Sequence, residues 1–126
     1  MRKTILMIDD DVELSRAVGR YVELKGWEFD STAEPEEAVG KARSVHPDLI
    51  LLDVNFPNTT GWNVCRTIKS DELARQVPVI MLSGARMSPE DKALGLEVGA
   101  DDYLTKPVDL ELLLLKAEAI LRVGGR

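Results

Sequence analysis

Polar side chains that could do chemistry follow four short runs that are expected to be strands. They are Asp9, Asp10 and Asp11 after residues 5–8, Asp53 after 49–52, Ser83 after 79–82 and Lys106 after 102–105. In a parallel sheet, ligands bind beyond the carboxyl ends of the strands, where these groups would meet. Clustered carboxylates repel one another and raise each other's pKa unless a hard cation and an ammonium offset their charge. Mg²⁺ and Lys106 fit these two requirements.

Asp53 is the residue best placed to act as a nucleophile. Mg²⁺ usually takes one or two protein carboxylates, keeps several waters and binds phosphate, so this acidic cluster indicates phosphate handling rather than a permanent metal cage. A carboxylate can attack phosphorus to give an acyl phosphate, while metal and lysine neutralise charge on the transferring oxygens. We therefore expect Asp53 to accept a phosphoryl group and Ser83 to donate a hydrogen bond to the product.

The pattern of apolar residues predicts a parallel sheet. Residues 5–8, 49–52 and 79–82 are continuous apolar runs, which are typical of central strands covered on both faces. Residues 27–30 alternate apolar and charged side chains, which suits a strand near the edge of a sheet. We therefore expect a buried centre and a wetter edge.

Segments with helical spacing separate these strands. The first helix should end at Gly26 with Asp11 as a candidate cap, the second should run from Pro35 to His46–Pro47, and the third from about Trp62 through Ile68. The fourth should begin at Ser88 and close at Gly99, and Asp109 should cap the last. Five repeats of strand then helix predict a single α/β domain with helices on both faces of a parallel sheet.

The bulk composition narrows the class of protein. A chain of 126 residues suits one domain, and its net charge of -6 argues against bulk attraction to nucleic acid or an anionic membrane. Cys65 is the only cysteine, so no intramolecular disulfide can form, and the first residues show no long apolar region with a small-residue cleavage site of the kind expected in a secretory signal. No apolar run approaches the roughly 18 residues that a bilayer requires. We expect a cytoplasmic protein that does not cross a membrane.

Four motifs carry a resemblance to a known family. They are Ile5-Leu6-Met7-Ile8-Asp9-Asp10-Asp11, Leu51-Leu52-Asp53-Val54-Asn55-Phe56-Pro57 with Gly61, Val79-Ile80-Met81-Leu82-Ser83-Gly84, and Gly99-Ala100-Asp101-Asp102-Tyr103-Leu104-Thr105-Lys106-Pro107. From Ile5 to about Leu121 the chain resembles a response-regulator receiver domain of two-component signalling. The resemblance implies a doubly wound, flavodoxin-like (βα)5 domain over residues 1–122 with strand order 2-1-3-4-5. Residues 123–126 would be a C-terminal tail or the start of a linker.

The resemblance also implies the roles of the acidic residues. Asp53 would be phosphorylated, and the Mg²⁺ ligands would be Asp10, Asp53 and the main-chain carbonyl of Asn55. Asp9 would act through metal-bound water. Asn55 and Ala85 occupy positions that the family uses to adjust the lifetime of the phosphoryl group.

A second set of residues would form the switch. The resemblance implies that Lys106 contacts the phosphoryl group, that Ser83 moves toward it, and that Tyr103 swings between two rotamers. Phosphorylation adds negative charge and acceptor oxygens, so Ser83 and Lys106 gain interactions that exist only in the modified state. Space vacated by Ser83 could accept Tyr103 and repack the surface formed by the helix after Ser88, strand 102–105 and the last helix.

Partners follow from the same resemblance. The phosphoryl donor would be a sensor histidine kinase or a histidine phosphotransfer protein, and an output domain or effector would bind the repacked surface. Four consecutive leucines, Leu112–Leu115, cannot all be buried by one helical stripe, so we expect a homodimer or output contact there. We expect no direct binding of nucleic acid by this domain and no catalytic turnover beyond Mg²⁺-dependent autophosphorylation and slow autodephosphorylation.

Two other classes of function compete with this interpretation. Haloacid-dehalogenase phosphatases also use a strand-end Asp nucleophile with Mg²⁺, Ser or Thr and Lys, but they place a second Asp two residues later as general acid. This chain has Asn55 at that position, and an amide cannot transfer the proton. A pseudo-receiver that binds a partner without phosphorylation is the third class, and the presence of Asp10, Asp53, Ser83 and Lys106 makes it less favoured.

Overall fold

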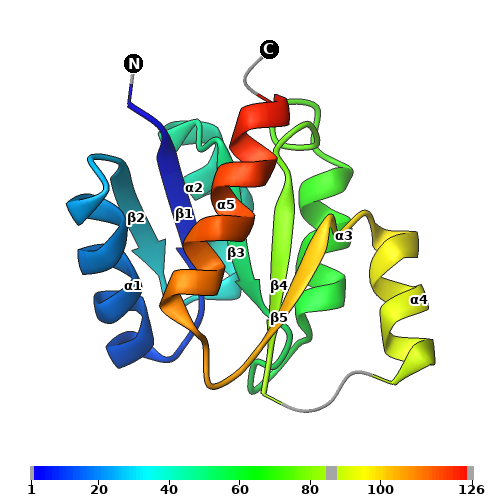
Figure 1. The fold of residues 1–126 in the computed structure, drawn as a ribbon. Helices are drawn as coiled ribbons and strands as arrows, with labels where there is room; N and C mark the ends of the chain where they lie inside the picture. The colour runs from blue at the N-terminus through cyan, green and yellow to red at the C-terminus, as the bar shows by residue number, and fades with distance from the viewer. Residues whose placement is uncertain (1, 85–87, 125–126) are drawn as a thin grey trace.

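A computed structural model describes residues 2–84 and 88–124 and contains five strands and five α-helices in alternation (Figure 1). The strands are β1 (Thr4–Ile8), β2 (Glu28–Thr32), β3 (Leu49–Asp53), β4 (Val79–Ser83) and β5 (Asp102–Thr105). The helices are α1 (Val12–Leu24), α2 (Ala38–Val45), α3 (Gly61–Lys69), α4 (Pro89–Val98) and α5 (Leu110–Gly124). All strand pairs are parallel, and the order β2-β1-β3-β4-β5 confirms the predicted doubly wound topology.

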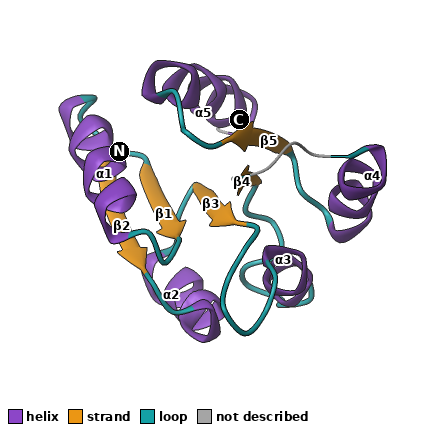
Figure 2. Ribbon diagram, turned by 90° about the horizontal axis from the view of Figure 1, so that it is seen from below, coloured by secondary structure: helices purple, strands orange, loops and turns teal. Residues whose placement is uncertain are grey.

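Helices cover both faces of the sheet, as expected (Figures 1 and 2). Side chains from α1 and α5 pack on one face, where Val18, Val22, Leu113 and Ala117 meet alternate residues of the strands. Helices α2, α3 and α4 pack on the other face. The apolar residues of β1, β3 and β4 are almost completely buried, because each of these strands has a neighbour on both sides and helices on both faces.

Strand β2 lies at the edge of the sheet, but its predicted bounds were wrong. The alternating segment 27–30 placed it too early, since the strand begins at Glu28 and continues to Thr32. Pairing with β1 sets these limits, because Thr4 lies opposite Glu28 and Ile8 opposite Thr32. The partner strand, rather than the alternation of β2 itself, decides where the strand ends.

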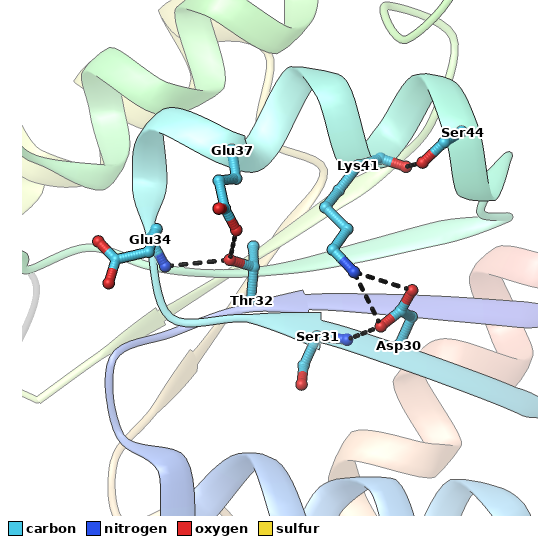
Figure 3. Close-up of polar contacts among 7 residues, drawn as sticks. All are labelled: Asp30, Ser31, Thr32, Glu34, Glu37, Lys41 and Ser44. Atoms are coloured by element: carbon cyan, nitrogen blue, oxygen red, sulfur yellow. Dashed lines mark hydrogen bonds and ion pairs between the residues drawn. The ribbon is translucent and has the colours of Figure 1, made fainter.

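The start of the second helix also differs from the prediction. Pro35–Glu37 form a single 3₁₀ turn, and the α-helix begins only at Ala38. The hydroxyl of Thr32 accepts a hydrogen bond from the Glu34 N–H and donates one to the Glu37 carboxylate (Figure 3). These two bonds satisfy groups at the turn and connect it to the end of β2, so the first turn is tighter than an α-helix.

The other predicted helix boundaries hold. Asp11 and Asp109 accept hydrogen bonds from the backbone of Leu14 and Leu112, and Ser88 accepts one from Asp91. Glycine and histidine occupy the left-handed region just after three helices, namely Gly26 after α1, His46 after α2 and Gly99 after α4. Helix α5 continues to Gly124, and the domain boundary expected at residue 122 stays a prediction.

None of the helices in residues 2–84 and 88–124 combines the length and the hydropathy that crossing a bilayer requires.

Candidate functional site

Three carboxylates meet at the carboxyl edge of the sheet, the end viewed in Figure 2. Asp9 and Asp10 follow β1, Asp53 ends β3, and one oxygen from each lies within 4.8 Å of the others. Asp9 is 1% exposed and Asp53 is 4% exposed, whereas Asp10 is exposed. Because β1 and β3 are neighbours in the sheet, the fold brings together residues that are more than forty positions apart in sequence.

The backbone holds two of these carboxylates in place. Asp9 Oδ1 accepts a hydrogen bond of 2.8 Å from the Asp11 N–H, and Asp53 Oδ1 accepts one of 3.2 Å from the Asn55 N–H. The Asp9 N–H in turn donates to the Thr32 carbonyl at 3.1 Å, which extends the pairing of β1 with β2. The site is therefore anchored by the sheet and by two tight turns.

Lys106 reaches the cluster from the end of β5. The Nζ of Lys106 lies 2.9 Å from Asp9 Oδ2 and 3.6 Å from Asp53 Oδ1. The main-chain N–H of Lys106 donates to the Ser83 carbonyl at 2.6 Å. Burial acts to lower the pKa of Lys106, but the carboxylates of Asp9 and Asp53 outweigh it and hold this pKa above its ordinary value. The ammonium is therefore charged at neutral pH and lies where the sequence predicted it.

The remaining charge in the cluster is unfavourable. Burial first, and then the charge of Asp9, raise the pKa of Asp53 to about 6, although the Asn55 N–H and Lys106 act in the opposite direction. One ammonium therefore does not neutralise the three carboxylates. A further positive charge at this point would relieve the repulsion.

The residues fit a small divalent cation. Asp9 Oδ2 is buried and lies 2.9 Å from the Lys106 ammonium. Asp9, Asp10 and Asp53 offer clustered hard oxygen atoms, which are the ligands that Mg²⁺ prefers. The donor set therefore agrees with the predicted metal.

Gly61 shapes the backbone beside Asp53. A Cβ at this position would overlap the Asp53 carbonyl oxygen and lie 2.8 Å from the Val54 Cα, so α3 begins in direct contact with the end of β3. The Gly61 N–H also donates to the Val54 carbonyl at 2.6 Å. Only glycine allows this close approach without a shift of the main chain.

Ser83 and Tyr103 lie on neighbouring strands. Ser83 ends β4 and is 3% exposed, one residue beyond Leu82, which pairs with Asp53. Tyr103 pairs with Met81, two residues before Ser83, so the side chains of Ser83 and Tyr103 project from the same face of the sheet. Both predicted switch residues thus lie on one face of the sheet, while Ala85 lies outside the described residues.

Sequence reasoning missed the partner of Tyr103 and a neighbouring groove. Tyr103 meets Trp62 of α3 edge to face, with ring centroids 6.2 Å apart. A groove of about 720 Å³ opens between α2 and α3 beside Asp10. Neither feature has a local sequence signal, because each depends on segments brought together by the sheet.

Cys65 is a buried residue of α3. Burial raises the pKa of its thiol to about 11, and Sγ donates to the Val98 carbonyl at 3.4 Å. A protonated, buried thiol is a poor nucleophile. Cys65 therefore belongs to the packing between α3 and α4.

Comparison with known proteins agrees with this geometry. Residues 5–118 match the family described as response regulator receiver domain. The chain is 39% identical over 122 residues to the DNA-binding dual master transcriptional regulator RpaA of Synechocystis sp., covering 97% of this chain and 50% of that protein. It is 39% identical over 123 residues to the phosphate regulon transcriptional regulatory protein PhoB of Pseudomonas aeruginosa, covering 98% and 53%. The chain thus spans about half the length of these curated relatives.

Solved structures show the same fold. A CheY-like receiver domain protein from Methanospirillum hungatei superposes with a TM-score of 0.90 at 28% identity, covering 99% of this chain and 98% of that one. The chemotaxis protein CheY4 of Vibrio cholerae has a TM-score of 0.89 at 30% identity, covering 95% and 99%. With the acidic cluster and Lys106 in place, these matches show that the chain belongs to the receiver domains of two-component response regulators.

Proposed function

We propose that this receiver domain takes a phosphoryl group onto Asp53 in a Mg²⁺-dependent reaction. The observation that supports the proposal is the cluster of Asp9, Asp10 and Asp53 with the Lys106 ammonium in ion-pair contact. Receiver domains generally bind Mg²⁺ at such an acidic pocket, and the charge left over in this cluster calls for a cation.

The proposed donor is a phosphohistidine of a sensor histidine kinase or a histidine phosphotransfer protein. A carboxylate oxygen of Asp53 forms a bond to phosphorus while the P–N bond breaks, and the bonding pair leaves with the imidazole nitrogen. Lys106 offers positive charge beside the acceptor oxygen, and the backbone bond from Asn55 keeps the carboxylate oriented. A Mg²⁺ held by Asp10, Asp53 and the Asn55 carbonyl, with Asp9 acting through water, would neutralise charge on the phosphoryl oxygens.

The phosphoryl group would act as a switch rather than as an intermediate of rapid turnover. We propose that Ser83 and Lys106 contact the new oxygens, and that Tyr103 changes position as Ser83 moves. Tyr103 lies on the same face of the sheet as Ser83, next to α4. The α4-β5-α5 surface would then repack for a partner, and slow autodephosphorylation would reset it.

Output partners are the second part of the proposal. Response-regulator receiver domains interact with histidine kinases and output domains, and the curated relatives above are named as transcriptional regulators. We propose that the receiver domain occupies residues 1–122, works in the cytoplasm, and controls an output domain or effector without binding nucleic acid itself.

Helix α5 offers a contact surface for such a partner or for a second copy. Leu112 is 42% exposed and Leu115 is 60% exposed, so two of the four consecutive leucines remain outside the core. They are three residues apart and therefore lie on adjacent positions of the helix surface. We propose that this pair contributes to a homodimer or an output contact.

The decisive experiment is incubation with acetyl phosphate and Mg²⁺ followed by intact mass. We expect a labile adduct of one phosphate in the wild type and none in Asp53→Asn, while Asp30→Asn, whose carboxylate pairs with Lys41 outside the acidic cluster, keeps the adduct. An adduct that persists in Asp53→Asn would contradict the assignment of Asp53 as the phosphoryl acceptor. Rapid hydrolysis of a generic phosphate ester such as p-nitrophenyl phosphate would instead favour a phosphatase.

A further inference from the structure

Helix α4 carries a glycine, Gly95, in its interior. Glycine is disfavoured there because it loses more backbone freedom on folding than alanine does. Its φ is not in the left-handed region, so backbone conformation does not require glycine at this position. The reason must be sought in what lies beside the Cα atom.

The neighbour of Gly95 is the phenol end of Tyr103. A Cβ on Gly95 would overlap the Tyr103 hydroxyl oxygen and Cζ and would lie 3.0 Å from Cε1. The Tyr103 ring therefore occupies the space that any other residue at position 95 would fill. The two cannot coexist in this arrangement.

Trp62 forms a second contact of the same ring. Its ring meets Tyr103 at an interplanar angle of 62° with centroids 6.2 Å apart, and Trp62 is buried on α3. Such edge-to-face contacts are favourable and directional. Tyr103 thus lies against both α4 and α3, which pack side by side on one face of the sheet (Figures 1 and 2). We refer to Gly95 and Trp62 together as the Tyr103 seat.

We infer that Gly95 is a positioning residue for the switch. The space that a side chain at position 95 would fill is the space that Tyr103 occupies in one of its two positions. The inference rests on the proposed function, in which Tyr103 moves when Asp53 is phosphorylated. When Tyr103 leaves the seat, α4 loses its contact at Gly95 and Trp62 loses an aromatic edge. The movement is thereby passed to two helices at once.

The obstacle that a side chain at position 95 would meet is a mobile one. The overlapped atoms are at the far end of Tyr103, which can rotate about its side-chain bonds, rather than main-chain atoms. Gly95→Ala should therefore leave the fold intact and displace Tyr103 from the seat. It would hold the switch in a single position.

The first test measures the seat without any phosphorylation. The chain has two tryptophans, so Trp27→Phe leaves the Trp62 indole N–H as a single resonance in ¹⁵N NMR spectra. In this background we expect Gly95→Ala and Tyr103→Leu each to shift the Trp62 resonance, and we expect Gly95→Ala to add no shift once Tyr103→Leu is present. Gly40→Ala is the matched control, since a Cβ on this α2 glycine meets nothing within 4 Å. An unchanged Trp62 resonance in Gly95→Ala would overturn the inference.

The second test separates phosphoryl uptake from the response to it. After addition of acetyl phosphate and Mg²⁺, the Trp27→Phe parent and its Gly95→Ala variant should each gain one phosphate, measured by intact mass. The Trp62 resonance should then move in the parent and in Gly40→Ala, whereas Gly95→Ala should lose that movement. A full movement in Gly95→Ala contradicts the inference. If the parent takes up no phosphate, the proposed function fails, while the first test still decides whether Gly95 and Trp62 form the seat.

Discussion

Asp53 and Tyr103 lie in the same sheet, and each has a glycine packed against it. The two glycines differ in the kind of atoms that surround them. At Gly61 the close neighbours are main-chain atoms of Asp53 and Val54, whereas at Gly95 they are the end of the Tyr103 side chain. The first glycine allows a fixed approach of helix to strand, and the second leaves room for the end of a side chain that the proposed switch would move. The difference suggests that the chemistry of this domain is built on rigid backbone and its response on side chains that can move.

The largest effect on stability is expected from a substitution at Gly61, where main-chain atoms are the close neighbours. Gly61→Ala should lower the free energy of unfolding by about 3 kcal/mol, because main-chain atoms cannot yield to the added methyl group as a side chain can. Gly95→Ala should change stability by less than about 1 kcal/mol, since displacement of Tyr103 is offset by the better helix propensity of alanine. Urea denaturation measures both, with Gly40→Ala as control. Equal midpoints for Gly61→Ala and Gly95→Ala would remove the distinction.

The second prediction concerns charge repulsion within the acidic cluster. The folded protein holds the Asp53 proton with a pKa of about 6 against an ordinary 3.8, so stability contributed by this group falls as pH rises between these values. Asp53→Asn should therefore be more stable than wild type by about 3 kcal/mol at pH 7 in EDTA. The gain should shrink as pH falls below 6 and vanish below about pH 3, where Asp53 is protonated in both the folded and the unfolded protein. Urea melts at several pH values decide the matter, and a gain independent of pH would speak against charge repulsion.

A third prediction concerns the cation. Mg²⁺ at ten times its dissociation constant should stabilise the wild type by about 1.4 kcal/mol, because it binds only the folded cluster. Asp10→Asn should lose most of this gain, since Asp10 is one of the three clustered carboxylates. Asp30→Asn should keep it. Thermal melts with and without MgCl₂ provide the measurement, and undiminished stabilisation of Asp10→Asn would place the ion elsewhere.

The smallest effect on stability is expected on α5. Leu112→Glu and Leu115→Glu should each change the free energy of unfolding by less than about 0.5 kcal/mol, because both side chains are substantially exposed. They should nevertheless weaken self-association or binding of an output partner, measured by sedimentation with and without acetyl phosphate. Leu73→Glu is the matched control, since Leu73 is 66% exposed and lies outside α5. If all three variants associate like wild type, the proposed surface is not an interface.

The sequence by itself determined the order of strands and helices, the central strands and most helix ends. Those features depend on local signals: continuous apolar runs, the caps at Asp11 and Asp109, and the stops at Gly26 and Gly99. It also indicated that Asp9, Asp10, Asp53 and Lys106 would meet, because parallel strands bring their carboxyl ends to one edge.

Tertiary structure alone decided the rest. The limits of β2 follow from its pairing with β1, and the 3₁₀ turn at Pro35–Glu37 is held by Thr32. The contact of Tyr103 with Trp62 and Gly95 joins three segments that are separate in sequence, so no local sequence pattern could predict it. Periodicity and capping report on near neighbours in the chain, whereas close packing is set by whichever atoms the fold brings together.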